Sequence, residues 1–527
     1  MKPIDVLIVG AGPAGLSAAI RLKELLDKDG RDASVVVIDK APSSGQHNLS
    51  GVAFEPACMD ELLPGWLDER SLLTDHVIPV KRDYMYFLVG GRAVHIPSFV
   101  VPSRMHHNGD VTISASRLVQ FMAQQAGKRG VEIYYGYSAR SLIVEQGVVN
   151  GVTLTDVGLD KSGEEKPNFR PGEEIRAKVT VLADGSHGVL STQFGELFGG
   201  GRNPQVYSLG VKAVVQFPGE NHFGNNRVVH TLGYPAPPSV FGGGFIYSTG
   251  EKTVAVGLIL GMDWKYGDLN AQREFERYRA HPFIARLLKG GVTIATGAKT
   301  IPEGGYLSLG TLSAPGALVA GDGAGFVNME KIKGIHYAVQ TGMCAADTIA
   351  DAFATGDFGE QALSPYRDRL VKRGIMAELE HARNYRQSFR WGLYVGTPLS
   401  LIQSRLPVRL KTHPDDQSTK SGARLARKDP GGMDQTTFVS LTGSIHREDE
   451  PSHVTIPDPS LCLQCAERFA NSCTHFCPGQ VYRWNNAEIV LSPSNCLHCM
   501  TCTVKCPYAN IRWVPPEGGE GQRFKLM

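Results

Sequence analysis

The sequence has no long hydrophobic run and no excess of one charge. The longest uncharged stretch of its 527 residues, around 234–250, is interrupted by proline and glycine, so we expect no helix that crosses a bilayer. Its 54 lysines and arginines nearly balance 52 acidic residues, which argues against nucleic-acid binding through bulk positive charge. The N-terminus runs directly into apolar residues 6–9 without a signal segment, from which we expect a cytoplasmic chain.

Cysteine is nearly absent from most of the chain. Only Cys58 and Cys344 precede residue 462, and neither has a partner at metal-ligand spacing, so we expect both to be small core residues. The rest of the ten cysteines lie between Cys462 and Cys506. Such clustering argues against the disulfide framework of a secreted protein and indicates a metal centre.

A glycine-rich turn lies near the N-terminus. A strand pattern is followed by three glycines, a helical pattern to about residue 26, a second strand pattern and an acid; the glycines and the acid are Gly10, Gly12, Gly15 and Asp39. In the Rossmann unit these glycines make the turn, admit a pyrophosphate and let the helix pack on the strand, while the acid binds a ribose hydroxyl. The flanking context favours a dinucleotide over a merely tight turn.

Two later segments favour FAD over NAD. One strand pattern ends at Asp184 and Gly185, and another ends at Gly321 and Asp322. An acid at such a turn can accept hydrogen bonds from a sugar-alcohol chain, while backbone N–H groups meet a phosphate or the flavin ring. The three segments together resemble the FAD domain of the glutathione-reductase and hydroxybenzoate-hydroxylase flavoproteins. No second complete glycine fingerprint follows a strand, so we expect no separate nicotinamide domain.

The C-terminal cysteines form two runs. The second run fits the bacterial ferredoxin pattern C-x2-C-x2-C-x3-C-P, and the first is the same pattern with a longer middle. Because the fourth cysteine of each run ligates the other cluster in such ferredoxins, one [4Fe–4S] cluster is expected on Cys477, Cys496, Cys499 and Cys502. The cysteines left for a second cluster are Cys462, Cys465, Cys473 and Cys506. A zinc ribbon is the alternative, although zinc sites usually use two separated pairs.

Six further segments are spread from end to end: GQHNLSG (45–51), FGGGFIY (241–247), GAK (297–299), EGG (303–305), KIKGIH (331–336) and NIRWVPPEGG (510–519). With the glycine and cysteine motifs they make the whole chain resemble the electron-transfer flavoprotein:ubiquinone oxidoreductase family. The resemblance implies one FAD, one [4Fe–4S] cluster and a quinone pocket. The sequence departs from mitochondrial members at Cys506, where they have no cysteine, and the number of clusters therefore stays open.

The resemblance also implies roles for single residues. Gly242 and Gly243 match the glycine pair that contacts the quinone, although their spacing alone would favour a strand-edge bulge. Gly334 and His336 follow the turn where the family places the flavin ring. As isolated residues they are equally compatible with core or solvated positions.

Amphipathic surface is the only route to membrane attachment that the sequence offers. An apolar and aromatic patch, residues 389–402, has basic flanks and is typical of an interfacial anchor; the flanks are Arg386, Arg390, Arg405 and Arg409. Residues 93–102 are a second candidate. The alternative is that both face the protein's own core. Residues 405–428 carry net charge +5 from seven basic and two acidic residues, and we expect a poorly ordered connector there.

We expect an α/β and α+β architecture in four parts. A Rossmann-like FAD domain takes 1–206 and 302–356, an inserted quinone-binding β-sheet domain takes 207–301, a helical membrane-surface segment and connector takes 357–431, and a ferredoxin-like iron–sulfur domain takes 432–527. A core helix is expected at 114–129.

The combination of centres predicts an electron relay without a catalytic acid–base pair. Electrons from reduced electron-transfer flavoprotein would pass through a [4Fe–4S] cluster and FAD to a membrane quinone at the cytoplasmic face of a bacterial inner membrane. One rival is an NAD(P)H-dependent flavin reductase or hydroxylase acting on an isoprenoid. Another is a non-catalytic module that binds zinc and FAD. Neither rival explains all the cysteines and the flavin motifs together.

Overall fold

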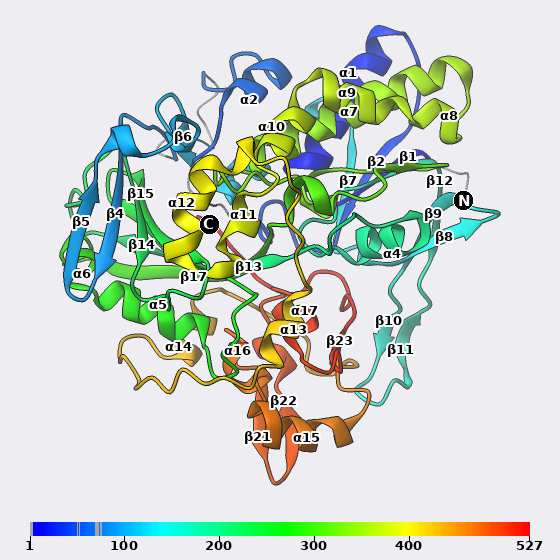
Figure 1. The fold of residues 1–527 in the computed structure, drawn as a ribbon. Coiled ribbons are helices and arrows are strands. Elements are labelled where there is room, and N and C mark those ends of the chain that lie inside the picture. The colour runs from blue at the N-terminus through cyan, green and yellow to red at the C-terminus, as the bar shows by residue number, and fades with distance from the viewer. Residues whose placement is uncertain (1–3, 50, 52, 69–72, 74–75) are drawn as a thin grey trace.

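The computed structural model describes residues 4–49, 51, 53–68, 73 and 76–527. Ser50 of the 45–51 segment lies outside these residues, as does Met1. Two large sheets and a small C-terminal domain make up the molecule, and Figure 1 shows the C-terminal domain below the two sheets.

The first sheet is built around parallel strands. Its order is β18-β19-β12-β1-β2-β7, and β8 and β9 form an antiparallel extension on β12. The strands are β1 (Ile4–Val9), β2 (Val35–Asp39), β7 (Glu132–Tyr135), β8 (Ala139–Glu145), β9 (Val148–Leu154), β12 (Glu174–Leu182), β18 (Ser313–Ala314) and β19 (Ala317–Val319). Because β1, β2, β12 and β19 are parallel, the turns that follow them meet at one edge of the sheet.

Alternating residues of these strands bury both faces of the sheet. Val6 and Ile8 pack with the helices α1 (Pro13–Lys28), α3 (Ala115–Lys128) and α7 (Ile335–Thr355). Leu7 and Val9 pack on the opposite side with α4 (Val189–Phe198) and β9. The helix expected at 114–129 is therefore confirmed as α3, and the fold is the layered α/β arrangement that the sequence predicted.

The second sheet has seven strands in the order β17-β13-β16-β15-β14-β4-β5. They are β4 (Arg82–Val89), β5 (Arg92–Ile96), β13 (Tyr207–Gln216), β14 (Arg227–Gly233), β15 (Gly242–Gly250), β16 (Thr253–Gly261) and β17 (Val292–Pro302). The structure differs here from the predicted domain division, which put 82–96 in the FAD domain. Strand β4 pairs in parallel with β14, from Arg82 on Arg227 to Leu88 on Gly233, so this hairpin extends the second sheet.

The expectation of a poorly ordered connector at 405–428 is wrong. Asp415 is buried, and its carboxylate accepts a hydrogen bond from the backbone N–H of Tyr207 at 2.8 Å. The buried Lys505 donates to the carbonyl oxygens of Asp415 at 3.2 Å and Trp264 at 3.0 Å. The connector is thus held between the second sheet and the C-terminal domain by partners that are distant in sequence.

The remaining elements are short. The other helices are α2 (Ala57–Leu62), α5 (Ala271–Ala280), α6 (Pro282–Leu287), α8 (Glu360–Leu363), α9 (Pro365–Lys372), α10 (Ile375–His381), α11 (Tyr385–Ser388), α12 (Leu393–Ile402), α13 (Asp415–Thr419), α14 (Gln435–Ser440), α15 (Pro459–Phe469), α16 (Cys473–Phe476) and α17 (Thr501–Lys505). Four two-stranded pairs are β3 (Val77–Pro79) with β6 (Val111–Ile113), β10 (Val157–Leu159) with β11 (Glu165–Arg170), β20 (Val454–Thr455) with β23 (Arg512–Trp513) and β21 (Tyr482–Asn485) with β22 (Glu488–Leu491). Among the described helices, none is long and apolar enough to cross a membrane.

Candidate functional site

One large cavity lies where the three parts of the molecule meet. Its wall includes the turns after β1, β2, β12 and β19, and residues of β13, β16 and β17 in the second sheet. The C-terminal domain adds His498, Met500 and Trp513. Of the residues predicted to bind FAD, those in the wall are Gly10, Gly12, Asp39, Asp184, Gly185, Asp322 and Gly334.

The three N-terminal glycines differ in what surrounds them. Gly10 has φ +108°, and a Cβ there would lie 2.2 Å from the carbonyl oxygen of Ala183. A Cβ on Gly15 would lie 1.9 Å from the Gly10 carbonyl oxygen, so Gly15 serves the packing of α1 and stays out of the cavity wall. The nearest atom to a Cβ on Gly12 is the Asn48 amide nitrogen at 3.5 Å. The start of α1 is therefore open to a ligand.

Two of the predicted acids hold the backbone of the turns. The Asp39 carboxylate accepts hydrogen bonds at 2.7 Å from the N–H groups of both Ala11 and Ala41, which ties the glycine turn to the end of β2. The Asp184 carboxylate accepts from the N–H groups of Leu190 at 2.8 Å and Ser191 at 3.2 Å. Asp184 thus caps the beginning of α4, a use of this acid that the strand pattern did not indicate.

The later turn brings Asp322 and Gly334 to the cavity, but leaves the other two predicted residues outside it. Burial raises the pKa of Asp322 to about 6, against the opposing effect of Lys299. Gly321 has φ +64°, and a Cβ there would lie 2.9 Å from that of Ala14, so it permits close packing on α1. His336 is buried beside Glu55, with 3.8 Å between Nε2 and the carboxylate, and burial lowers its pKa to about 4.

Three lysines in the cavity wall were missed by the sequence reasoning. Burial lowers the pKa of Lys40 to about 8 and that of Lys212 to about 7, and it also lowers the pKa of Lys299. Lys212 donates to the Tyr247 hydroxyl at 2.8 Å. Lys212 and Lys299 lie inside strands, where a lysine carries no spacing signal, although Lys299 belongs to the GAK segment. These side chains favour an anionic ligand, as the pyrophosphate of FAD is.

Gly242 and Gly243 begin β15 and do not line the cavity. Gly242 has φ +152°, and a Cβ on it would lie 2.2 Å from the Ile259 carbonyl oxygen; on Gly243 it would lie 2.4 Å from that of Thr231. Crowding between strands therefore accounts for both glycines. The preceding Phe241 contacts Phe389, with ring centroids 4.9 Å apart.

The first predicted cysteine set lines one small void, and all four of its members are present: Cys477, Cys496, Cys499 and Cys502. Backbone N–H groups of Val481 and His498 donate to the sulfurs of Cys477 at 3.5 Å and Cys496 at 3.4 Å. Four soft thiol donors around one void suit an iron–sulfur cluster. Met500 and Trp513 line both this void and the large cavity.

The second set lines a separate void, again with all four members: Cys462, Cys465, Cys473 and Cys506. The two isolated thiols, Cys58 and Cys344, are buried in the core around α1 and α7, as expected.

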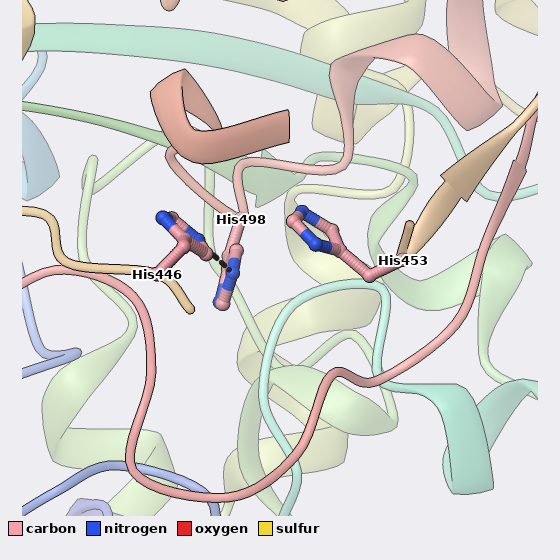
Figure 2. A group of neighbouring side chains, drawn as sticks. All are labelled: His446, His453 and His498. Carbon is pink, nitrogen blue, oxygen red and sulfur yellow. Dashed lines mark hydrogen bonds between the residues drawn. The ribbon is translucent and has the colours of Figure 1, made fainter. Parts of the chain in front are cut away.

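Three histidines gather beside the first void. Figure 2 shows His446, His453 and His498 together, with the Nε2 atoms of His446 and His498 2.9 Å apart. The ring of His453 stacks on that of His446, with centroids 5.2 Å apart. Burial lowers the pKa of His446 to about 4 and that of His453 to about 3, so the rings are neutral at pH 7. His498 also lines the large cavity, which places this trio between the two sites.

Comparison with known proteins identifies the family. Residues 432–525 match the family described as "Electron transfer flavoprotein-ubiquinone oxidoreductase, 4Fe-4S", and residues 207–301 match "ETF-QO, ubiquinone-binding". A protein of Pseudomonas aeruginosa named electron transfer flavoprotein-ubiquinone oxidoreductase is 36% identical over 99% of this chain and 98% of its own length. The chain belongs to the electron transfer flavoprotein-ubiquinone oxidoreductase family. A probable mitochondrial member from Schizosaccharomyces pombe is 37% identical over 100% of this chain and 86% of its own length.

The nucleotide-binding fold has independent matches. Residues 8–55 match a "NAD(P)-binding Rossmann-like domain". A geranylgeranyl bacteriochlorophyll reductase-like protein of Thermoplasma acidophilum superposes with a TM-score of 0.58 at 20% identity, over 77% of this chain and 92% of that one. The predicted family, fold class, oxidoreductase class and cofactor set of FAD and a [4Fe–4S] cluster, with a quinone as substrate, are confirmed. The individual ligand residues stay predictions.

Proposed function

We propose that this oxidoreductase accepts electrons from reduced electron-transfer flavoprotein and delivers them to a quinone at a bilayer surface, on the cytoplasmic face of a bacterial inner membrane. The observation that carries the proposal is the convergence of three parts of the chain on one cavity. Its wall is formed by the carboxyl edge of the parallel sheet, by one side of the seven-stranded sheet and by four residues of the C-terminal domain, His498, Met500, Trp513 and Pro515. A cofactor in this cavity can be reached from both the cysteine domain and the second sheet.

The FAD site lies at the edge of the parallel sheet. Gly12 leaves room for the pyrophosphate at the N-terminus of α1, and Lys40 and Lys299 add positive charge to the same cavity. Asp322 and Gly334 line the part that follows β19 and precedes α7. Gly15 and Gly321 do not line the cavity. They let α1 pack closely on its neighbours, and this packing forms the cavity wall.

Cys477, Cys496, Cys499 and Cys502 are assigned to the [4Fe–4S] cluster. When bound, such a cluster exchanges single electrons and a flavin exchanges one or two, which together can supply the two electrons that quinone reduction requires. The protein contributes placement, because Met500 and Trp513 form a wall common to the cysteine void and the cavity. Backbone N–H groups aimed at the sulfurs stabilise their thiolate form.

An apolar cluster leads from the cavity toward α12, and this is the route that we assign to the quinone. Val327, Met329 and Ile301 line the cavity and belong to the same cluster as Phe241 and Phe389. Gly242 and Gly243 follow Phe241 directly, so a quinone headgroup in this cluster lies beside the start of β15. A long isoprenoid tail is dissolved in the bilayer, and the cluster's outer end must therefore open at the interface.

Exposed apolar side chains lie on both candidate anchor segments, residues 389–402 and 93–102. Tyr394 is 70% exposed, Trp391 48% and, in the second candidate segment, Phe99 89%. The other exposed large apolar residues of the two segments are Val94, Val100, Val395, Leu401 and Ile402. Exposed Arg390 lies over the Trp391 ring at 4.7 Å, an arrangement suited to the headgroup layer.

Two members of the predicted anchor patch are core residues. Phe389 and Leu393 pack with Tyr385 in the apolar cluster. Arg386, expected as a basic flank, is buried and pairs with Glu303 at 2.6 Å and Asp263 at 2.7 Å. The patch thus combines an inward face that closes the apolar cluster with an outward face that remains available to lipid.

The test replaces only outward residues. The triple variant Trp391→Ser, Tyr394→Ser, Leu401→Ser should no longer bind liposomes, because each apolar group buried in lipid contributes roughly 1.5–3 kcal/mol to the free energy of membrane binding. Reduction of a long-tailed quinone should slow, while a short-tailed, water-soluble quinone should be reduced nearly as fast as by the wild type.

The matched control is a triple variant of exposed apolar residues elsewhere, Leu197→Ser, Val292→Ser and Val371→Ser. It should stay bound to liposomes. If the α12 variant is folded and equally membrane-bound, α12 is not the anchor and this part of the proposal fails.

A further inference from the structure

The C-terminal domain holds twice the number of thiols that one [4Fe–4S] cluster uses. Four of these cysteines do not line the first void, and they come from three different helices: Cys462 and Cys465 on α15, Cys473 at the start of α16, and Cys506 just after α17. All four nevertheless line one small void. The first set lines a void of its own in the same way.

The two voids also share a local backbone pattern. The N–H group of Val481 donates to Cys477, four residues before it, and the N–H group of Asn510 donates to Cys506 at 3.3 Å, again four residues before it. Each of these cysteines is followed by proline. In the second void the Asn510 side chain adds a longer contact, 3.9 Å, to the sulfur of Cys462. Hydrogen bonds to sulfur are a feature of iron–sulfur ligation, and here they recur at both sites.

The two sites are joined crosswise. Cys473 of the second set and Cys477 of the first are one helical turn apart at α16, and Cys502 and Cys506 are one turn apart at α17. Each short helix therefore supplies one thiol to each void. This is the exchange of fourth cysteines that ferredoxins with two clusters use.

The arrangement of the thiols does not point to zinc. A single zinc ion would bring four sulfurs to roughly 3.8 Å from one another, at bonds of about 2.3 Å. Among the described residues, the group of three or more ligand side chains close enough together to hold one metal ion is His446, His453 and His498. Neither set of four cysteines forms such a group, which favours a cluster over a single zinc ion at each site.

We propose that Cys462, Cys465, Cys473 and Cys506 bind a second [4Fe–4S] cluster, on the solvent side of the first. The first void shares Met500 and Trp513 with the large cavity, whereas within the described chain the second void shares no wall residue with it. Its outer wall is α15, where Leu463 is 48% exposed. Figure 1 shows α15 at the tip of the C-terminal domain, far from α12.

The direct test is the metal content of the full-length protein, purified without oxygen. We expect about eight iron atoms and eight acid-labile sulfides per FAD, without zinc. About four iron atoms and four sulfides, with or without zinc, would overturn the proposal. On reduction, two neighbouring paramagnetic clusters should give a broadened, magnetically coupled spin-resonance spectrum rather than that of one isolated cluster.

Variants assign the iron to each site. Cys465→Ala should lose about half of the iron, keep FAD and convert the spectrum to that of a single cluster; Cys499→Ala should lose the other half. The control Cys344→Ala removes a buried thiol of the parallel-sheet core and should keep all the iron. Unchanged iron in Cys465→Ala refutes the assignment. If Cys465→Ala instead loses all iron, the iron count and the spin-resonance spectrum of the wild type decide whether the protein holds one cluster or two. These readouts do not depend on which electron donor or quinone the enzyme uses.

Discussion

The two large sheets contribute to the same cavity in different ways. The parallel sheet presents the ends of its strands, where Gly10 follows β1, Asp39 ends β2 and Asp322 lies in the turn after β19. The seven-stranded sheet presents the interior of its strands, with Lys212 on β13 and Lys299 on β17. Gly210 is the register partner of Lys299, so the lysine has a neighbour without a side chain.

This difference decides what each sheet can offer a ligand. Strand ends expose backbone N–H groups and the start of a helix, and they act through close approach, which only glycine permits. A strand interior has its backbone paired and can act only through side chains, here mostly through charge. Substitution of a glycine at a strand end should therefore abolish FAD binding, while substitution of a lysine inside a strand should only weaken it.

The largest effect is expected from Gly12→Val. A branched side chain would fill the open space at the start of α1, so FAD should be lost, while the brown absorbance of the iron–sulfur domain should remain. FAD is measured by absorbance after release from the protein. The control Gly127→Val in α3 also enters open space, but away from the cavity, and should retain FAD. A fully loaded Gly12→Val protein would contradict the distinction between strand ends and interiors.

A smaller effect is expected from Lys299→Met. Removing this charge should weaken FAD binding by about 1.5–3 kcal/mol, roughly tenfold to a hundredfold, because a hydrogen bond or ion pair to a charged group is lost. Titration of the FAD-depleted protein with FAD measures the change. Lys252→Met, at an exposed lysine in the turn between β15 and β16, is the control and should bind FAD as the wild type does. Complete loss of FAD in Lys299→Met would show that FAD binding depends as strongly on the strand interiors of the second sheet as on the strand ends of the parallel sheet.

The sequence predicted the parts of the site that depend on fixed spacing. The glycines at 10, 12 and 15 and the two cysteine runs are recognisable because a turn or a cluster needs those residues at those intervals. The lysines were not predictable, because their neighbours in the cavity come from strands far apart in the chain. His336 was misplaced for a related reason: the sequence puts it near the turn, but the helix α7 directs it to Glu55.

The segment between the FAD and cysteine domains was the least predictable. Its charge suggested a disordered connector, yet Asp268 accepts hydrogen bonds from the N–H groups of Leu425 at 2.6 Å and Ala426 at 2.7 Å. The sequence placed Arg386 among lipid-facing charges, but its side chain is buried and pairs with Asp263 and Glu303, which are distant in sequence. In both cases partners supplied by tertiary structure satisfy polar groups that the local sequence would leave to solvent.

The most direct test of the whole account compares electron donors for the full-length protein on liposomes that contain a long-tailed ubiquinone. Reduced electron-transfer flavoprotein should reduce the ubiquinone in the presence of catalytic amounts of the protein, with electron-transfer flavoprotein and liposomes alone as the blank. NADH and NADPH should neither bleach the bound flavin nor reduce the quinone, because no second glycine fingerprint provides a nicotinamide site. Rapid bleaching by NADH or NADPH, without any reaction with reduced electron-transfer flavoprotein, would contradict the account.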